Sequence, residues 1–192
     1  MTRLRQIAEY STASIALFIA RNLPTALVYL LVRALALALF CISFRRRGIT
    51  LSNLEMAFPK LTRWQRWRLG LSSFLNIADT TAESLLLLAG RITQDDFEVM
   101  IDGAEVERLC RIASEEQEKG LLFITAHIGN WELMAHYVAL QLGRRLNVVA
   151  RETSNPFLEE YFVSPLRTCF GNNVIYKKNA LRNMIKALRK GE

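Results

Sequence analysis

A histidine and a carboxylate stand close together in the segment that runs from His127 to Glu132. The apolar run at 121–126 just before it predicts a buried strand. Asn130 is a predicted N-cap for a helix that starts near Trp131. His127 is therefore expected at the C-terminal end of a strand, with Glu132 in the first turn of the next helix. In α/β folds, ligands bind at that edge of the sheet.

Histidine at such an edge can take a proton from a hydroxyl group, while a nearby carboxylate fixes its tautomer and stabilises the imidazolium. The pair therefore predicts His127 as a general base and Glu132 as the group that orients it. A plainer interpretation stays open. A histidine after a strand is often a hydrogen-bonded turn residue, and the helix dipole alone favours Glu132 in a first turn. We interpret His136, one turn further on, as structural.

Basic residues follow the later predicted strands. Arg151 comes directly after a strand at 146–150, at the same expected edge as His127. It could bind phosphate or steady an oxyanion, or it could simply face solvent. A second basic cluster could hold phosphate groups or an acidic carrier, although such a run is also typical of a solvated face. This cluster comprises Arg167, Lys177, Lys178 and Arg182.

The C-terminal part of the sequence alternates strand and helix patterns, which predicts an α/β fold with parallel strands joined by right-handed crossovers. The expected strands are 121–126, 146–150 and 173–176. The expected helices are 131–142, which Gly143 should end, and 180–189, with a loop and a helix between 155 and 170.

The N-terminal part is apolar. Residues 25–44 are about long enough to cross a bilayer, although an arginine in mid-membrane, here Arg33, costs about 2.5–3.5 kcal/mol. Pro24 is expected to start or kink this segment. The basic triplet 45–47 favours the cytoplasmic side at that end. A buried core helix is the alternative, and the apolar stretch is too long for a signal peptide.

Residues between these parts read as mostly helical. Pro59 is expected to stop a short helix, Thr62 to cap the next one and Gly90 to end it. A short strand near 97–101 and an exposed charged helix at 105–119 follow. The predicted organisation is a membrane anchor (1–47), a helical segment that packs on the catalytic domain (48–119) and the first part of an α/β domain (120–192).

Composition narrows the partners. Hydrophobic residues make up 51% of the 192 residues and the formal net charge is +7. A positive net charge suits a partner that is anionic, such as anionic lipid or an acidic carrier protein. Nucleic acid is a less suitable partner, because the basic residues are dispersed and form no recognition motif. The three cysteines match neither a metal site nor a disulfide framework, so we expect buried or half-buried thiols in a reducing compartment and no metal.

Three sequence features together resemble one family. The first is the N-terminal apolar segment followed by Asn-Leu-Glu-Met-Ala-Phe-Pro at 53–59. The second is His-Ile-Gly-Asn-Trp-Glu at 127–132, and the third is the order of Arg151, Asn155-Pro156, Arg167 and the basic segment 177–191. In these features the chain resembles the lauroyl/myristoyl acyltransferases of bacterial lipid A biosynthesis, in the lysophospholipid-acyltransferase-like superfamily.

The resemblance implies a glycerolphosphate-acyltransferase-like α/β domain at the bacterial inner membrane, with its catalytic part on the cytoplasmic side. It implies that His127 deprotonates a hydroxyl of a lipid A precursor and that Glu132 orients His127. The donor would be an acyl thioester on acyl-carrier protein, which requires no cofactor. Substrate binding would involve Asn130, Arg151, Arg167, Lys177 and Lys178.

Members of that family are usually about half as long again, and they continue into another strand and an Asp-Gln segment. The α/β domain is therefore expected to be truncated at its C-terminus. Two alternatives stay open: an acyltransferase for another glycolipid or phospholipid acceptor, and an inactive membrane-attached remnant.

Overall fold

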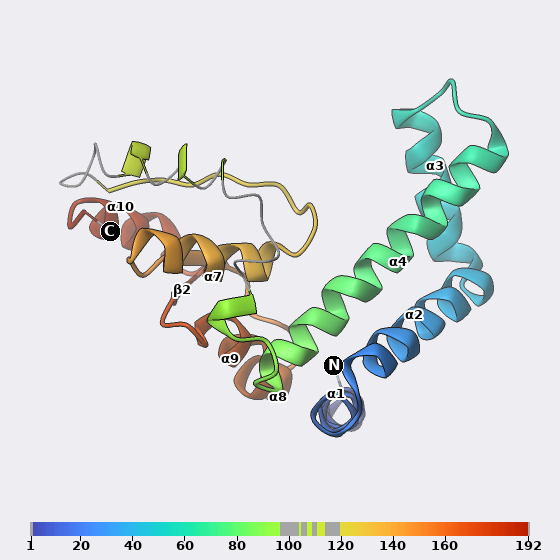
Figure 1. Cartoon of the computed structure of the whole chain (residues 1–192), viewed down its shortest axis with the longest axis horizontal. Helices are drawn as coiled ribbons and strands as arrows, with labels where there is room; N and C mark the ends of the chain where they lie inside the picture. Colours follow the sequence, from blue (N-terminus) through green and yellow to red (C-terminus); the bar gives the residue numbers. More distant parts are fainter. Residues whose placement is uncertain (1, 97–103, 105–106, 109–110, 114–119, 192) are drawn as a thin grey trace.

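The computed structural model describes residues 2–96, 104, 107–108, 111–113 and 120–191, and it has two parts (Figure 1). The first, the helical part, contains α1 (Arg3–Asn22), α2 (Thr25–Ile42), α3 (Phe44–Ala57) and α4 (Arg63–Leu88). The second, the α/β part, contains α7 (Trp131–Leu142), β1 (Asn147–Ala150), α8 (Pro156–Leu158), the π-helix η1 (Glu159–Val163), α9 (Ser164–Thr168), β2 (Asn173–Tyr176) and α10 (Ala180–Leu188).

Helices α2 and α4 pack along each other, and α4 continues to the α/β part (Figure 1). Small side chains allow the close approach, since Ala82 of α4 is fully buried beside Val28 of α2. At the other end, Phe40 is fully buried against Trp67 and Phe74. Aromatic rings in this edge-to-face arrangement attract each other beyond the area that they bury.

Arg33 has an ionic partner in the structure. Its Nε and Nη2 donate to Oδ1 and Oδ2 of Asp79 on α4, at 2.6 and 2.9 Å. A two-pronged pair of this kind neutralises the charge that the sequence places within the apolar helix. The arginine therefore belongs to the contact between α2 and α4.

Helix α2 is long and apolar enough to cross a membrane. A core helix or a signal sequence can have the same length and composition, so this agreement alone is weak evidence. However, large apolar side chains on α2 face outward, including Leu30, Leu35 and Ile42. Membrane attachment stays a prediction that this exposed surface favours.

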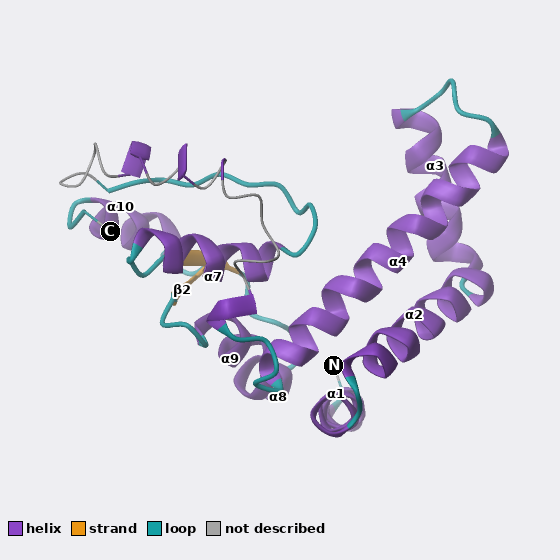
Figure 2. Cartoon of the chain, viewed as in Figure 1, coloured by secondary structure: helices purple, strands orange, loops and turns teal. Residues whose placement is uncertain are grey.

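Strands β1 and β2 form a two-stranded parallel sheet among the surrounding helices (Figure 2). The register pairs Asn147 with Asn173 and Ala150 with Tyr176. Both strands and their parallel direction confirm the sequence prediction, and α10 packs against them. The sheet therefore carries the residues that follow its two strands at one common edge.

The predicted strand at 121–126 is wrong. These residues have no regular secondary structure and are mostly exposed, with Ile124 at 90% exposure. An apolar run can form a buried strand only when a neighbouring strand pairs with its backbone hydrogen-bonding groups. In the described part of the chain, β1 and β2 pair only with each other.

Predicted helix boundaries were more accurate. Thr62 caps α4 together with Gln65, Pro24 precedes α2, and Gly143 follows α7 with φ +59°. The loop and helix expected between 155 and 170 form three short helices in succession, α8, η1 and α9. The predicted strand near 97–101 lies outside the described residues, and the helix at 105–119 is described only at 107–108 and 111–113.

Two further expectations need correction. The short helix before Pro59 is the end of α3, which already begins at Phe44 and includes the basic triplet 45–47. Cys41 and Cys169 are free but exposed, rather than buried or half-buried. Cys110 lies outside the described residues.

Helix α1 reaches the α/β part, which the sequence analysis did not anticipate. The buried Asn155 donates from Nδ2 to the carbonyl oxygen of Gln6 and to Oε2 of Glu9, at 2.9 and 3.0 Å. Tyr10 packs its ring against Phe157 and Phe162. The helix expected to serve only as part of an anchor is thus docked beside η1.

Candidate active site

His127 lies on an exposed turn directly before α7. Its ring packs against that of Trp131, with centroids 4.9 Å apart. Gly129 between them has φ +61°, a left-handed conformation that glycine adopts without strain. The turn therefore presents an accessible imidazole beside the N-terminus of α7, although no strand positions it.

Glu132 occupies the first turn of α7 and has a half-buried side chain. Its Oε1 accepts a hydrogen bond from Nε of Arg167 at 3.3 Å. The described contacts of Glu132 include no hydrogen bond to His127. Cooperation between His127 and Glu132 therefore stays a prediction, whereas Glu132 and Arg167 are in direct contact.

Asn130 fixes the start of α7 and joins it to α4. Its Oδ1 accepts the backbone N–H of Leu133 at 3.2 Å, which confirms the predicted N-cap. Its Nδ2 donates to Oε2 of Glu83 at 2.8 Å. Glu83 is a neighbour of the candidate site that the sequence analysis missed, and its signal was a carboxylate within a largely apolar helical stretch. Substrate binding by Asn130 stays a prediction.

Glu159 is the second residue that the sequence analysis missed. Its Oε2 accepts the backbone N–H of Thr153 at 2.7 Å, and its Oε1 accepts the hydroxyl of Tyr176 at 2.9 Å. Burial alone would raise the pKa of Glu159, but these hydrogen bonds and the charge of Arg167 outweigh it and lower that pKa. Glu159 is therefore held as a carboxylate inside the α/β part.

His136 is fully buried, in agreement with its structural interpretation. Its Nε2 lies 2.7 Å from the carbonyl oxygen of Leu166, and its Nδ1 lies 3.3 Å from Nδ2 of Asn172. A carbonyl can only accept and an amide nitrogen can only donate, so Nε2 carries the proton and the ring is neutral. Burial lowers the pKa of His136 and outweighs the opposing effects of Leu166 and Glu132.

This histidine predicts a pH dependence of stability. The folded pKa of His136 lies below its ordinary value of 6.5, so the unfolded chain binds the proton more readily. The stabilisation is complete above about pH 6.5 and is lost as the pH falls towards the folded pKa. We expect urea unfolding midpoints to drop between about pH 7.5 and about pH 5.5 in the wild type and less in His136→Gln. The His127→Gln control should keep the wild-type drop, and an equal drop in both variants would contradict this assignment.

Two of the basic residues meet at the carboxyl edge of the sheet. Arg151 follows β1 and Lys177 follows β2, and both are exposed. The backbone N–H of Lys177 donates to the carbonyl oxygen of Ala150 at 3.0 Å, which extends the pairing of the strands. The register therefore brings Arg151 and Lys177 side by side. The expected place of His127 at the same edge stays a prediction, because no strand precedes His127.

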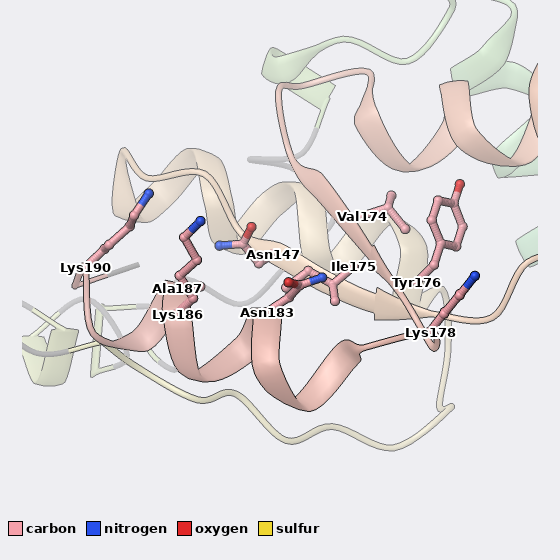
Figure 3. A pocket seen from close by; sticks show the side chains of 9 residues that line it. All are labelled: Asn147, Val174, Ile175, Tyr176, Lys178, Asn183, Lys186, Ala187 and Lys190. Carbon is pink, nitrogen blue, oxygen red and sulfur yellow. The ribbon is translucent and has the colours of Figure 1, made fainter.

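Lys178 lines an open hollow of about 400 Å³ between the strands and α10 (Figure 3). No carboxylate lines it, and its polar side chains are lysines, asparagines and one tyrosine. The lining residues are Asn147, Val174, Ile175, Tyr176, Lys178, Asn183, Lys186, Ala187 and Lys190. Such a surface attracts anionic groups.

Comparison with known proteins places this geometry in a family context. The sequence model of the bacterial lipid A biosynthesis acyltransferases matches residues 2–192. Searches of curated proteins and of solved structures found no match. Because the family match covers almost every residue, including the turn with His127 and the network around Glu132, the chain belongs to the bacterial lipid A biosynthesis acyltransferase family.

Proposed function

We propose that this protein transfers a fatty acyl chain from an acyl thioester on acyl-carrier protein to a hydroxyl of a lipid A precursor. The family match over residues 2–192 carries this proposal, because it supports acyl transfer in lipid A biosynthesis. The acceptor oxygen attacks the thioester carbonyl carbon, the C–O bond forms and the C–S bond breaks. The hydroxyl proton passes to the base and then to the departing thiolate. This exchange is balanced without a cofactor.

His127 is the base in this proposal. Its imidazole is exposed and lies at a turn that substrates can approach, whereas His136 is buried with both ring nitrogens in contact with protein groups. Of the two histidines in the chain, only His127 can therefore meet an acceptor hydroxyl without rearrangement. Glu132 orients His127 and balances the charge that develops on it.

We assign the chain to the bacterial inner membrane, with the α/β part on the cytoplasmic side. Support comes from the outward-facing apolar residues of α2 and from the basic triplet 45–47 directly after it. Basic residues beside an apolar segment favour the cytoplasmic side. A lipid acceptor and a soluble carrier protein can meet an enzyme in that position.

The basic residues contact the anionic parts of the substrates in this proposal. Arg151 and Lys177 bind phosphate groups or the phosphopantetheine arm of the carrier. Lys178 and its hollow beside α10 attract the acidic carrier protein. Arg167, by contrast, contacts Glu132.

The role of the hollow can be tested with Lys178→Ala combined with Lys186→Ala. We expect KM for acyl-carrier protein to rise by about tenfold at low salt, with kcat nearly unchanged, because long-range attraction acts on association. The difference from the wild type should shrink as ionic strength rises. Lys60→Ala, which removes an exposed lysine between α3 and α4, is the matched control. An unchanged KM in the double variant would exclude the hollow as a carrier-binding surface.

The activity itself is tested with membranes that contain the chain, labelled acyl-carrier protein thioester and a tetra-acylated lipid A precursor. Membranes without the chain give the background. Labelled penta-acylated product supports the proposal. Transfer only to another glycolipid or phospholipid in an acceptor panel would replace the proposed acceptor, and absence of transfer to every acceptor would contradict enzymatic activity of this chain.

A further inference from the structure

Three half-buried charges form a line through the α/β part. Glu132 contacts Nε of Arg167, and Nη1 of Arg167 lies 3.9 Å from Oε1 of Glu159. The side chains of Glu132, Arg167 and Glu159 are only 18%, 16% and 14% exposed. One cation thus stands between the carboxylate of Glu132 and that of Glu159.

Glu159 is itself fixed from two directions. The backbone of Thr153, after β1, and the hydroxyl of Tyr176, at the end of β2, each donate to one of its carboxylate oxygens. Glu159 also begins the π-helix η1. Segments of π-helix occur frequently at functional sites, because they are otherwise unfavourable. The line of charges therefore ends on residues at the carboxyl ends of β1 and β2.

Stability alone explains this arrangement poorly. Nη1 of Arg167 is buried and has no hydrogen-bond partner among the described residues. An unsatisfied buried donor costs about 1–3 kcal/mol, more for charged groups. Apolar residues of similar volume are often at least as stabilising as a buried ion pair. Because the buried guanidinium of Arg167 adds little stability, we infer that it has a functional role in the site.

We propose that Arg167, held by Glu159, is a positioning residue that fixes the Glu132 carboxylate beside His127. This inference rests on the proposed function, because it assigns a purpose to the orientation of Glu132. It replaces the substrate-binding role for Arg167 by an action through Glu132. Glu159 is a positioning residue of the same line and touches no substrate.

Kinetics separate positioning from binding. In Glu159→Gln and Arg167→Met we expect kcat to fall by about 10²-fold, since a small displacement of a catalytic group has effects of this size. KM for both substrates should stay within about twofold. Glu159→Asp keeps the charge and should recover part of kcat. Glu160→Gln, an exposed neighbour with the same chemical change, is the matched control. A raised KM with unchanged kcat in Arg167→Met would overturn the proposal in favour of substrate binding.

A second measurement does not depend on activity. Nitrogen-15 NMR can follow the Nε–H of Arg167, which is assigned by its disappearance in Arg167→Lys. We expect slow hydrogen exchange in the wild type and faster exchange in Glu132→Gln and in Glu159→Gln, but not in Glu160→Gln. Unchanged exchange in Glu159→Gln would overturn the positioning role. Faster exchange in a protein without acyl transfer would support the line of contacts and reject the proposed function.

Discussion

Replacement of His127 by alanine is expected to reduce acyl transfer by about 10²–10⁴-fold, the usual contribution of a general base. The imidazole is exposed on its turn and contacts Trp131, so its removal should leave the fold intact. Initial rates with saturating donor and acceptor measure the effect. Because the turn is open, added imidazole is expected to restore part of the lost rate.

Thr125→Ala is the control for this experiment, since Thr125 is an exposed residue of the same segment. It should retain the wild-type rate. Equal rates for His127→Ala and the wild type would refute the role of His127 as base. A large loss that is matched by Thr125→Ala would instead indicate that the segment, rather than the imidazole, is required.

The second large effect is expected in the helical part. Phe40→Ala should lower the free energy of unfolding by about 3–5 kcal/mol, the range for loss of a fully buried phenylalanine. Phe40 is 0% exposed, and its ring lies 5.3 Å from that of Trp67 and 5.1 Å from that of Phe74. The cavity would open at the contact between α2 and α4. Unfolding of the purified chain in detergent, followed by tryptophan fluorescence, gives the measurement.

Phe18→Ala removes the same ring at a site that is 66% exposed. It should change the unfolding midpoint far less than Phe40→Ala. Similar midpoints for the two variants would show that α2 and α4 do not pack through Phe40. This comparison therefore tests the helical part independently of any catalytic activity.

Local signals in the sequence were sufficient for helix ends and for the sheet. The cap at Asn130 depends on hydrogen bonds within four residues, and the stop at Gly143 depends on one backbone conformation. The parallel strands follow from the spacing of two apolar runs around a helical segment. These features need no knowledge of distant residues.

The candidate site was predictable only in part, because its remaining contacts are distant in sequence. His127 and Glu132 could be named from their types and spacing. Arg167 and Glu132 are in contact although they lie 35 residues apart in the sequence. No periodic pattern in the sequence indicates that Glu159 also contacts Arg167. The strand predicted at 121–126 was wrong because an apolar pattern does not indicate whether a partner strand lies beside it.

The docking of α1 has a consequence for the order in which the chain takes shape during synthesis. Asn155, which binds the backbone of Gln6, follows it by 149 positions. Residues near the N-terminus leave the ribosome first, and domains generally form as their segments emerge. Helix α1 therefore cannot form its contacts with the α/β part until Asn155 has been synthesised. During that interval its exposed apolar residues, such as Ile15 and Phe18, are free to meet a lipid surface first. A helix that is made early thus reaches its packed position late.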